Sequence, residues 1–403
     1  MLSVCGCRSV SQEGNQPGRP QDMTAQTDPH QSSNAEDGAG PLRRSVEVEY
    51  WVVDEAGRLT DPGPLVDASP GVEREFVEPL LEIKTPPCET TAQLREQLYD
   101  RLSCVLTVAE TEGRGLVPLA TPLDASAIGD LDHERTRIQD RVVGEAFECV
   151  RHCAGTHIHF EQRPGHETEQ LNTLTALDPA LALVNSSPYF RGSRLAASAR
   201  SELYRWRAYD SLPHQGQLWP YAEDIREWAT RLEQRYEEFV TEAVLVGFDR
   251  GDVEAEFAPE SAVWTPVKLR EEFSTVEWRS PDAALPSQVV RLADQLGSVV
   301  ERVAGSEVRI EGEAGGVSDE AIVLPEFDAL QEYVQAGIHE GLSAPAVRSY
   351  LARMGLDVSL FDPLTHEFDT QGELSQERTR ELRLAYADRL REDVTRVTPV
   401  AAD

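Results

Sequence analysis

The segment RRSVEVEYWVVD, residues 43–54, alternates polar and apolar side chains along much of its length. Side chains two positions apart lie on the same face of a β-strand, so the alternation predicts a strand with one buried and one polar face. Glu47 and Glu49 both fall on the polar face. The segment therefore predicts a sheet with neighbouring carboxylates on one surface.

Three other predicted strands carry polar residues at the same spacing. The pairs are His157 with His159 in residues 155–161, Lys268 with Arg270 in residues 263–270, and Glu277 with Arg279 in residues 274–280. Any single pair fits an ordinary solvated strand face, because charged residues mostly lie outside. Four pairs on neighbouring strands would gather carboxylates, imidazoles and guanidinium groups on one sheet surface.

The stretch CVRHCAGTHIHFEQ, residues 149–162, raises the alternative of a zinc site. Cys149, Cys153 and His157 are spaced unlike the two close pairs of a structural zinc site, and they need a fourth ligand. His157 and His159 share a strand face, whereas the cysteines precede that strand. We therefore expect the cysteines to be core residues and the imidazoles to join the carboxylates.

Helix-like and strand-like segments alternate irregularly along the chain. The helical periodicity covers residues 91–113, 167–184, 221–245, 286–304, 326–354 and 373–395. No regular βαβ period or glycine-rich phosphate loop is present, so we expect an α+β fold around a mostly antiparallel sheet flanked by helices. Residues 1–42 have the composition of a disordered tail. Residues 43–305 form the predicted main domain, and residues 306–403 a mainly helical region packed on it.

Acidic residues dominate the charge of the 403-residue chain. Asp and Glu number 71 against 38 Lys and Arg, which gives a net charge of −33. Such a surface repels nucleic acid and anionic lipid, and it suits molar salt, where self-repulsion is screened. No apolar run approaches the ~20 residues of a membrane helix. We expect a halophilic, cytoplasmic protein of haloarchaeal origin that binds neither nucleic acid nor membranes.

Carboxylates combined with one or two imidazoles predict a site for a hard divalent cation. Mg²⁺ fits such ligands, keeps several waters and binds phosphates, and Mn²⁺ is the alternative. Cationic side chains on the same surface would neutralise phosphate oxygens during transfer. The predicted sheet is then a platform for a nucleotide and a metal.

Five segments, in this order, resemble the carboxylate–amine ligase branch of the glutamate–cysteine ligases, a group related in fold to glutamine synthetase. They are SVEVEYWVVD (45–54), EPLLEIKTPPC (78–88), GTHIHF (155–160), SSPYFRG (186–192) with ASAR (197–200), and TVEWRSPDA (275–283). The resemblance implies a glutamine synthetase-like domain over residues 43–305, whose curved, six-stranded antiparallel sheet binds ATP and Mg²⁺.

The resemblance also implies a reaction. The γ-carboxylate of glutamate would attack the γ-phosphate of ATP to give an acyl phosphate, and the amine of cysteine would displace phosphate to form γ-glutamylcysteine. Two alternatives stay open: a ligase of the same class that joins another carboxylate and amine, and a non-catalytic nucleotide-binding paralogue. A homo-oligomer also stays open.

The resemblance assigns a role to each matching residue. Glu47, His157 and Glu277 would bind metal on the ATP-phosphate side, and Glu49 and Glu82 would hold metal nearer the glutamate. Arg279 would stabilise the transferring phosphoryl group, Arg200 would contact phosphate or a substrate carboxylate, and Ser187 and Ser198 would shape the pocket. His157 is preferred to His159, which would orient it from outside the metal's ligand shell.

The sequence departs from the family pattern at several positions. Valine separates the two acids of the first strand, where the family usually has three successive acids. The segment GVEREF, residues 71–76, resembles that opening, but we expect no metal ligand from it because it runs straight into the next strand. Lys84 stands where an Asn is common, and Lys268 or Arg270 would replace a usual Arg-Pro at the nucleotide side.

Overall fold

The computed structural model describes residues 40–129, 131, 133–368 and 372–397. The described residues from Pro41 onward belong to one compact unit. The predicted tail, residues 1–42, lies almost entirely outside the described residues, so its disorder stays a prediction. The predicted division at residue 305 also stays a prediction.

The main sheet has seven strands, and six of them follow the spatial order β2-β3-β1-β5-β9-β8 while β4 pairs with β1. The strands are β1 (Arg44–Asp54), β2 (Val72–Arg74), β3 (Leu80–Lys84), β4 (Arg114–Val117), β5 (Thr156–Glu161), β8 (Val267–Arg270) and β9 (Thr275–Trp278). Every pairing among them is antiparallel. The predicted α+β class with an antiparallel sheet is confirmed.

Two smaller sheets and the helices complete the described chain. The first small sheet has β10 (Glu307–Ile310), β11 (Gly316–Val317) and β12 (Ala321–Leu324), and the second pairs β6 (Tyr189–Phe190) with β7 (Ser193–Arg194). The helices are α1 (Thr91–Thr111), α2 (Glu134–Val143), α3 (Glu148–Arg151), α4 (Glu167–Ala176), α5 (Ala199–Trp206), α6 (Ile225–Leu245), α7 (Arg250–Glu256), α8 (Pro259–Ala262), α9 (Pro286–Arg302), α10 (Phe327–His339), α11 (Pro345–Arg353) and α12 (Gln376–Val397). None of the described helices is long and apolar enough to cross a bilayer.

Some predicted elements are shorter than the periodicity indicates. The strand predicted over residues 263–270 begins at Val267, directly after Pro266, which has no N–H to donate to a sheet. The helix predicted over residues 326–354 divides into α10 and α11 around Gly341, whose φ of 62° lies in the left-handed region that interrupts a right-handed helix. Apolar periodicity alone therefore overestimates element length where proline or a left-handed glycine intervenes.

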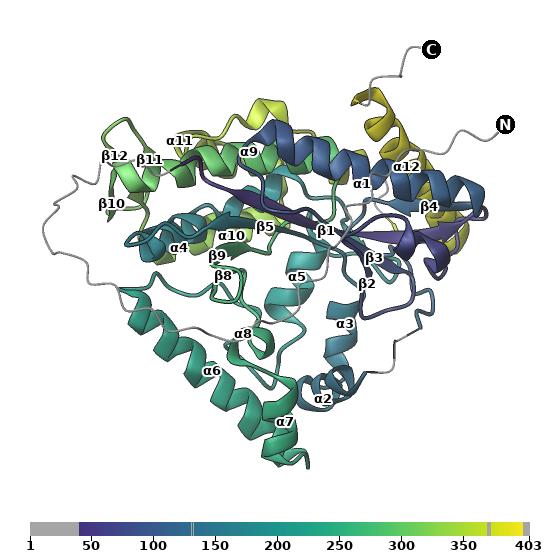
Figure 1. The fold of residues 1–403 in the computed structure, drawn as a ribbon, viewed down its shortest axis with the longest axis horizontal. Helices are drawn as coiled ribbons and strands as arrows, with labels where there is room; N and C mark the ends of the chain where they lie inside the picture. The colour runs from purple at the N-terminus through teal and green to yellow at the C-terminus, as the bar shows by residue number, and fades with distance from the viewer. Residues whose placement is uncertain (1–39, 130, 132, 369–371, 398–403) are drawn as a thin grey trace, which may run out of the picture. The chain divides into compact units, whose positions relative to one another are not determined.

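The alternation in β1 separates the two faces of the main sheet. Val46, Val48 and Tyr50 are fully buried, and helices α1 and α9 pack against this sheet from one side (Figure 1). Glu47 and Glu49 point to the opposite side, which Figure 1 shows facing α5 and α8. The apolar face therefore forms the core, and the polar face is left for a site.

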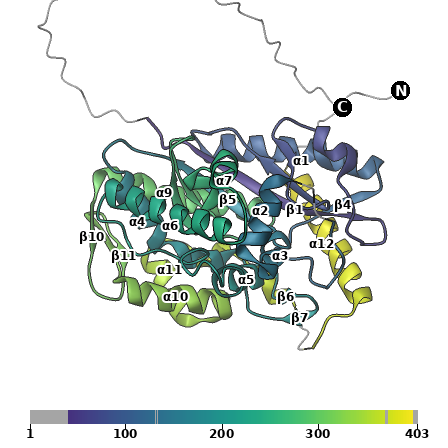
Figure 2. The same ribbon diagram turned by 90° about the horizontal axis from the view of Figure 1, so that it is seen from below.

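Helix α12 packs beside β4 and α1 (Figure 2). Its Arg383 side chain is only 2% exposed and places Nη2 2.6 Å from Oδ1 of Asp124. The same guanidinium donates from Nε to the carbonyl of Pro122 at 3.1 Å. A buried ion pair therefore fixes α12 to the segment that follows β4.

Candidate active site

The strand register places the predicted polar residues opposite one another on one face of the sheet. The facing pairs are Glu47–His157, Glu47–Lys84, Glu49–Glu82, His159–Glu277 and Lys268–Glu277. Along each strand these residues alternate with the buried apolar residues, so they lie on the opposite face of the sheet. The expectation that the polar pairs of four strands share one surface is confirmed.

Glu47, His157 and Glu277 form the first cluster, in which one ligand atom from each residue lies within 4.8 Å of the others. Nδ1 of His157 lies 3.1 Å from Oε2 of Glu47 and 3.8 Å from Oε1 of Glu277. Glu277 is fully buried and Glu47 half-buried. The structure thus brings together the three residues predicted for the ATP-phosphate side.

His159 faces the same two carboxylates. Its Nε2 lies 3.7 Å from Oε1 of Glu47 and 3.7 Å from Oε1 of Glu277, and this buried atom has no hydrogen-bond partner among the described residues. Its Nδ1 lies 3.1 Å from Oγ1 of Thr275, which orients the ring. An orphaned imidazole nitrogen between two carboxylates fits a divalent cation. Both imidazoles reach the cluster, so the preference for His157 stays a prediction.

The electrostatics of the first cluster favour charged carboxylates and a neutral His157 imidazole. Burial alone would raise the pKa of Glu47, but the hydrogen bond from His157 and the neighbouring imidazole of His159 hold it well below its usual range. Burial, and then the charge of Arg279, lowers the pKa of His157 to about 4. Near neutral pH these are the protonation states that metal binding requires.

Glu49, Glu75 and Glu82 form the second cluster, again with ligand atoms within 4.8 Å of one another. Glu49 and Glu82 were predicted together, but Glu75 belongs to GVEREF. The geometry adds Glu75 to this potential cluster, and the expectation that the segment supplies no metal ligand stays a prediction. β2 turns back and pairs with β3, with Glu73 opposite Glu82, and this returns Glu75 to the same face. The period-two acids Glu73 and Glu75 were the signal for it.

The second cluster has little positive charge to balance it. Lys84 places Nζ 2.8 Å from Oε2 of Glu82 and 3.0 Å from Oε2 of Glu73. Burial, and then the charges of Glu47 and Glu49, raises the pKa of Glu82 to about 7. Burial also raises the pKa of Glu75 well above its usual range. The carboxyl groups therefore retain protons that a divalent cation would displace.

Arg279 lies between the two clusters and forms an ion pair with Glu277. It lines a pocket together with Glu49, Glu75, His157 and Lys268. Its buried Nε has no hydrogen-bond partner among the described residues. The predicted phosphoryl-stabilising arginine is thus placed at the acidic clusters, and its role stays a prediction.

Arg200 lies directly behind Arg279, with only 2% of its surface exposed. Its Nη2 donates to the carbonyl of Arg279 at 3.1 Å, and its Nη1 donates to the carbonyl of Ser280 at 3.0 Å. A Cβ atom on Gly155 would lie 2.4 Å from Nη2, so only glycine permits this approach. These contacts support a positioning role for Arg200, whereas contact with a substrate stays a prediction.

Ser187 and Ser198 are fully buried away from the acidic clusters. Ser198 caps α5 and donates from Oγ to Oδ1 of Asp282 at 2.9 Å. Oγ of Ser187 lies 2.5 Å from Oγ1 of Thr121. The contacts show both serines joining chain segments, and neither is among the residues that line the pocket beside Arg279. Their predicted role in shaping it stays a prediction.

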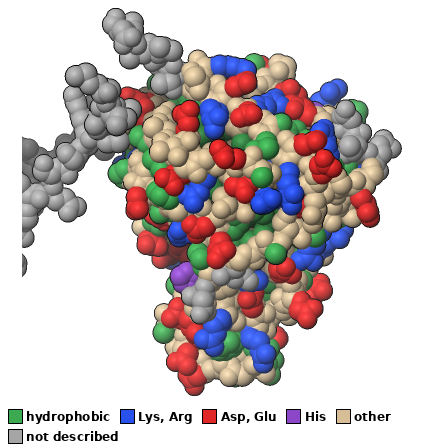
Figure 3. Space-filling view, turned by 90° about the vertical axis from the view of Figure 1, so that its right-hand side faces the viewer, with side chains coloured by type: hydrophobic (Ala, Val, Ile, Leu, Met, Phe, Trp, Pro, Cys, Tyr) green, Lys and Arg blue, Asp and Glu red, His purple; other side chains and the backbone are tan. Residues whose placement is uncertain are grey.

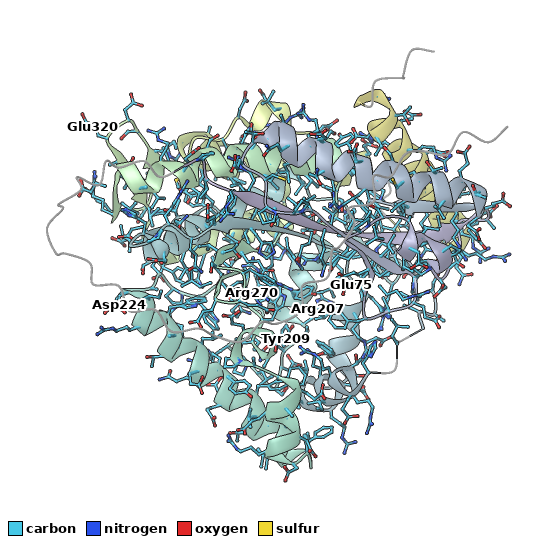
Figure 4. The ribbon with its side chains drawn as sticks, in the orientation of Figure 1. Glu75, Arg207, Tyr209, Asp224, Arg270 and Glu320 are labelled. Atoms are coloured by element: carbon cyan, nitrogen blue, oxygen red, sulfur yellow. The ribbon has the colours of Figure 1, made fainter. Side chains whose placement is uncertain are left out.

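Lys268 and Arg270, the predicted nucleotide-side cations, lie at the β8 edge. Lys268 donates from Nζ to the carbonyl of Glu260 at 2.9 Å, and burial, then the charge of Arg279, lowers its pKa to about 7. Arg270 reaches Oε2 of Glu277 at 2.9 Å. Figure 4 shows Arg270 on the same side of the sheet as Glu75 and Tyr209. Both cations therefore lie near the first cluster.

The zinc alternative finds no support in the described residues. Cys153 is buried and donates from Sγ to the carbonyl of Cys149 at 3.2 Å. Burial raises the pKa of the Cys153 thiol well above its usual range, which opposes the thiolate that zinc needs. Neither cysteine belongs to the two potential metal clusters found in the described part of the chain. Cys153 packs with Phe190 and Leu203.

Comparisons with known proteins agree with this geometry. Two relatives bear the provisional name glutamate–cysteine ligase 2-1. The protein from Rhodococcus jostii is 26% identical over 194 residues, covering 45% of this chain and 52% of the relative. That from Mycobacterium sp. strain KMS is 27% identical over 200 residues, covering 47% of this chain and 53% of the relative. The chain thus spans about half the length of the curated relatives that it matches.

A solved structure supports the fold. The bifunctional glutathione synthetase from Pasteurella multocida superposes with a TM-score of 0.56 at 15% identity, over 87% of this chain and 52% of that one. Residues 30–350 match the family model of glutamate–cysteine ligase family 2. This range includes both acidic clusters and Arg279. The chain therefore belongs to the glutamate–cysteine ligase family 2.

Proposed function

We propose that the chain is an ATP-dependent ligase that joins a carboxylate to an amine, with glutamate and cysteine as the leading substrates. One observation carries the proposal: two clusters of metal-binding side chains lie on one sheet face, joined by the neighbouring β1 residues Glu47 and Glu49. Arg279, which is partly buried, lines the pocket beside them. Two cation sites beside an arginine suit transfer of a phosphoryl group.

Mg²⁺ is the proposed cofactor, with Mn²⁺ as the alternative. Glu47, Glu277 and an imidazole would hold one ion, and Glu49, Glu75 and Glu82 a second. Oxygen-rich clusters with one nitrogen donor suit these hard cations. When bound, the ions neutralise phosphate charge. The three carboxyl groups of the second cluster repel one another when they are ionised. Without a bound cation, this repulsion would lower the stability of the fold.

The proposed reaction proceeds in two displacements. An oxygen of the donor carboxylate bonds to the γ-phosphorus of ATP while the bond between that phosphorus and the ADP oxygen breaks. The amine nitrogen then bonds to the acyl carbon, phosphate leaves, and the nitrogen loses a proton. Arg279 would neutralise charge on the phosphoryl oxygens, and its ion pair with Glu277 holds it in place. Arg200 supports the Arg279 backbone.

The test is ADP release in molar KCl with Mg²⁺ and glutamate, against a panel of amines that includes cysteine. The assay contains molar KCl because we infer a high-salt cytoplasm from the net charge of −33. Cysteine-dependent ADP and phosphate release supports the leading substrates. If ADP and phosphate are released only with another amine, the proposed ligase class stands and that amine replaces cysteine as the proposed substrate. Nucleotide binding without release for any pair would indicate a non-catalytic paralogue.

Two variants make this assay specific. Glu277→Gln removes a fully buried member of the first cluster and should abolish release. Glu272→Gln changes an exposed acid in the neighbouring β8–β9 turn and should leave release unchanged. Release that persists in Glu277→Gln would come from a contaminating ATPase or from another site.

A further inference from the structure

The two neighbours of Arg279 in the chain, Trp278 and Ser280, point away from the pocket that Arg279 lines. Both side chains are buried, and neither lines that pocket. Adjacent residues of an extended chain point to opposite sides, so whatever holds these two side chains also directs Arg279. β9 ends at Trp278, and the side chain of Arg279 therefore projects from a segment just beyond the paired part of the strand.

Asp178 binds both of these neighbours. Its Oδ1 accepts a hydrogen bond from Nε1 of Trp278 at 2.9 Å and a second one from the hydroxyl of Ser280. Asp178 is fully buried and follows α4, which packs against β8 and β9 (Figure 1). One carboxylate oxygen therefore joins the residues on either side of Arg279 to a distant part of the chain.

Arg205 of α5 completes the network. Its Nη2 lies 2.7 Å from Oδ2 of Asp178 and donates to Oγ of Ser280 at 3.0 Å. Arg205 is only 4% exposed, so both charges of the pair are removed from water. α5 also carries Arg200, which donates to the carbonyls of Arg279 and Ser280. The segment is thus held through its side chains by one ion pair and through its carbonyls by Arg200.

Stability alone does not account for a charged pair at this position. Transfer of two charges from water into the interior is unfavourable, and apolar residues of similar size often replace a buried ion pair without loss of stability. The network does provide direction, because charged hydrogen bonds to several fixed partners restrict the arrangement of the chain. Direction is what the proposed phosphoryl transfer requires of Arg279, whose donors must face the developing charge.

We propose that Asp178 is a positioning residue, which holds Trp278 and Ser280 so that the side chain of Arg279 is directed into the pocket. The inference rests on the proposed ligase function and assigns a further residue to its phosphoryl-transfer step. Asp178 belongs to neither metal cluster found in the described residues, and it does not line the pocket. Its effect on the reaction is therefore transmitted through Arg279.

A double-mutant cycle tests this dependence on Arg279. Asp178→Asn keeps the size of the side chain and one acceptor oxygen, but it removes the charge that pairs with Arg205. It should lower kcat about 10- to 100-fold, the scale of a small displacement of a catalytic group, with little change in the KM for ATP. In an Arg279→Lys background the same substitution should change kcat far less, because the group that it positions is absent. Equal losses of kcat in both backgrounds, or no loss in the wild-type background, would overturn the proposal.

Two further variants separate positioning from folding. Ser280→Ala removes one hydroxyl and leaves the Asp178–Arg205 ion pair in place, so it should retain the fold and lower kcat by a smaller factor. If Asp178→Asn does not fold, the cycle with Arg279→Lys is run with Ser280→Ala.

Asp124→Asn is the matched control, because Asp124 forms a similarly buried ion pair with Arg383 at 2.6 Å and neither residue lines the pocket. This variant should lower the free energy of unfolding and leave kcat unchanged. A loss of kcat as large as that of Asp178→Asn would assign the effect to lost stability and reject positioning.

Failure of the ligase function can be told apart from failure of the positioning. Absence of ADP release with every substrate pair removes the ligase proposal. The direction of Arg279 is then judged from crystal structures, which need no turnover. Arg279 should keep its ion pair with Glu277 in the wild type and in Asp124→Asn but lose it in Asp178→Asn, whereas an unchanged Arg279 side chain in all three proteins rejects the proposal.

Discussion

Lys84 lies with its Nζ 2.8 Å from Oε2 of Glu82, at the edge of the second cluster. Lys84 supplies positive charge at the edge of that cluster, and it is one of only two lysines in the chain. Burial nevertheless raises the pKa of Glu82 to about 7. The proton on Glu82 and a divalent cation therefore compete for the same oxygen atoms near neutral pH.

We predict that the apparent Mg²⁺ affinity rises as pH increases through 7. Below that pH Glu82 holds its proton, and the cation must displace it. Lys84→Met removes a charge that lowers this pKa, so the midpoint of the affinity change should move to higher pH. Mg²⁺ titrations of ADP release between pH 6 and 8.5 measure both midpoints. Identical midpoints would contradict the competition.

Glu75→Gln should raise the Mg²⁺ concentration needed for half-maximal activity, because it removes one carboxylate from the second cluster. The expected change is about tenfold or more, the scale of losing one charged interaction. Glu78→Gln, an exposed acid three residues away, is the control and should behave like the wild type. If Glu75→Gln leaves the Mg²⁺ dependence unchanged, the residue is not a metal ligand.

Arg279→Lys should lower kcat about 100-fold with a smaller effect on the KM for ATP. Lysine keeps the charge but loses the planar donors that neutralise a transferring phosphoryl group. Because Arg279 also pairs with Glu277, the Mg²⁺ dependence should be measured in the same variant. A loss confined to Mg²⁺ affinity would assign Arg279 to the metal cluster instead of to the transfer step.

The melting temperature should rise steeply with KCl concentration. The net charge is −33, and Figure 3 shows acidic side chains spread over one face of the molecule. Between 0.01 and 1 M salt the Debye length falls from about 30 to about 3 Å, which removes most of the self-repulsion. Sucrose of equal osmolality supplies no ions and is the control. Equal melting temperatures with and without KCl would refute halophilic stabilisation.

Arg383→Met should destabilise the fold by about 3–5 kcal/mol, because it leaves the buried carboxylate of Asp124 without a positive charge beside it. The double variant Arg383→Met with Asp124→Leu removes both charges and should recover part of that loss. Urea unfolding in molar KCl measures the free energy of unfolding of each protein. Additive effects would show that the two side chains do not depend on each other.

The first cluster could be predicted because its members obey strand periodicity. Glu47, His157 and Glu277 lie on three neighbouring strands, and alternation alone assigned each to the polar face. Glu75 could not be assigned to the second cluster from the sequence, because its position there depends on the pairing of β2 with β3. The turn between β2 and β3 reverses the chain over a few residues. The local sequence pattern does not specify which strand β2 then pairs with.

The α12 contact could not be predicted. Arg383 and Asp124 are separated by 259 positions. In so acidic a chain, arginines and carboxylates offer too many alternative pairings for charge alone to select this one.

The Arg383–Asp124 pair also bears on the order in which the chain acquires its structure during synthesis. A domain generally folds as a unit, although the N-terminal part of its chain leaves the ribosome first. Asp124 would emerge early and wait for α12, the last element that the structure describes. The segment after β4 leads into α2. The Arg383–Asp124 pair can therefore form only after α12 has left the ribosome, and the segment between β4 and α2 is fixed no earlier than that.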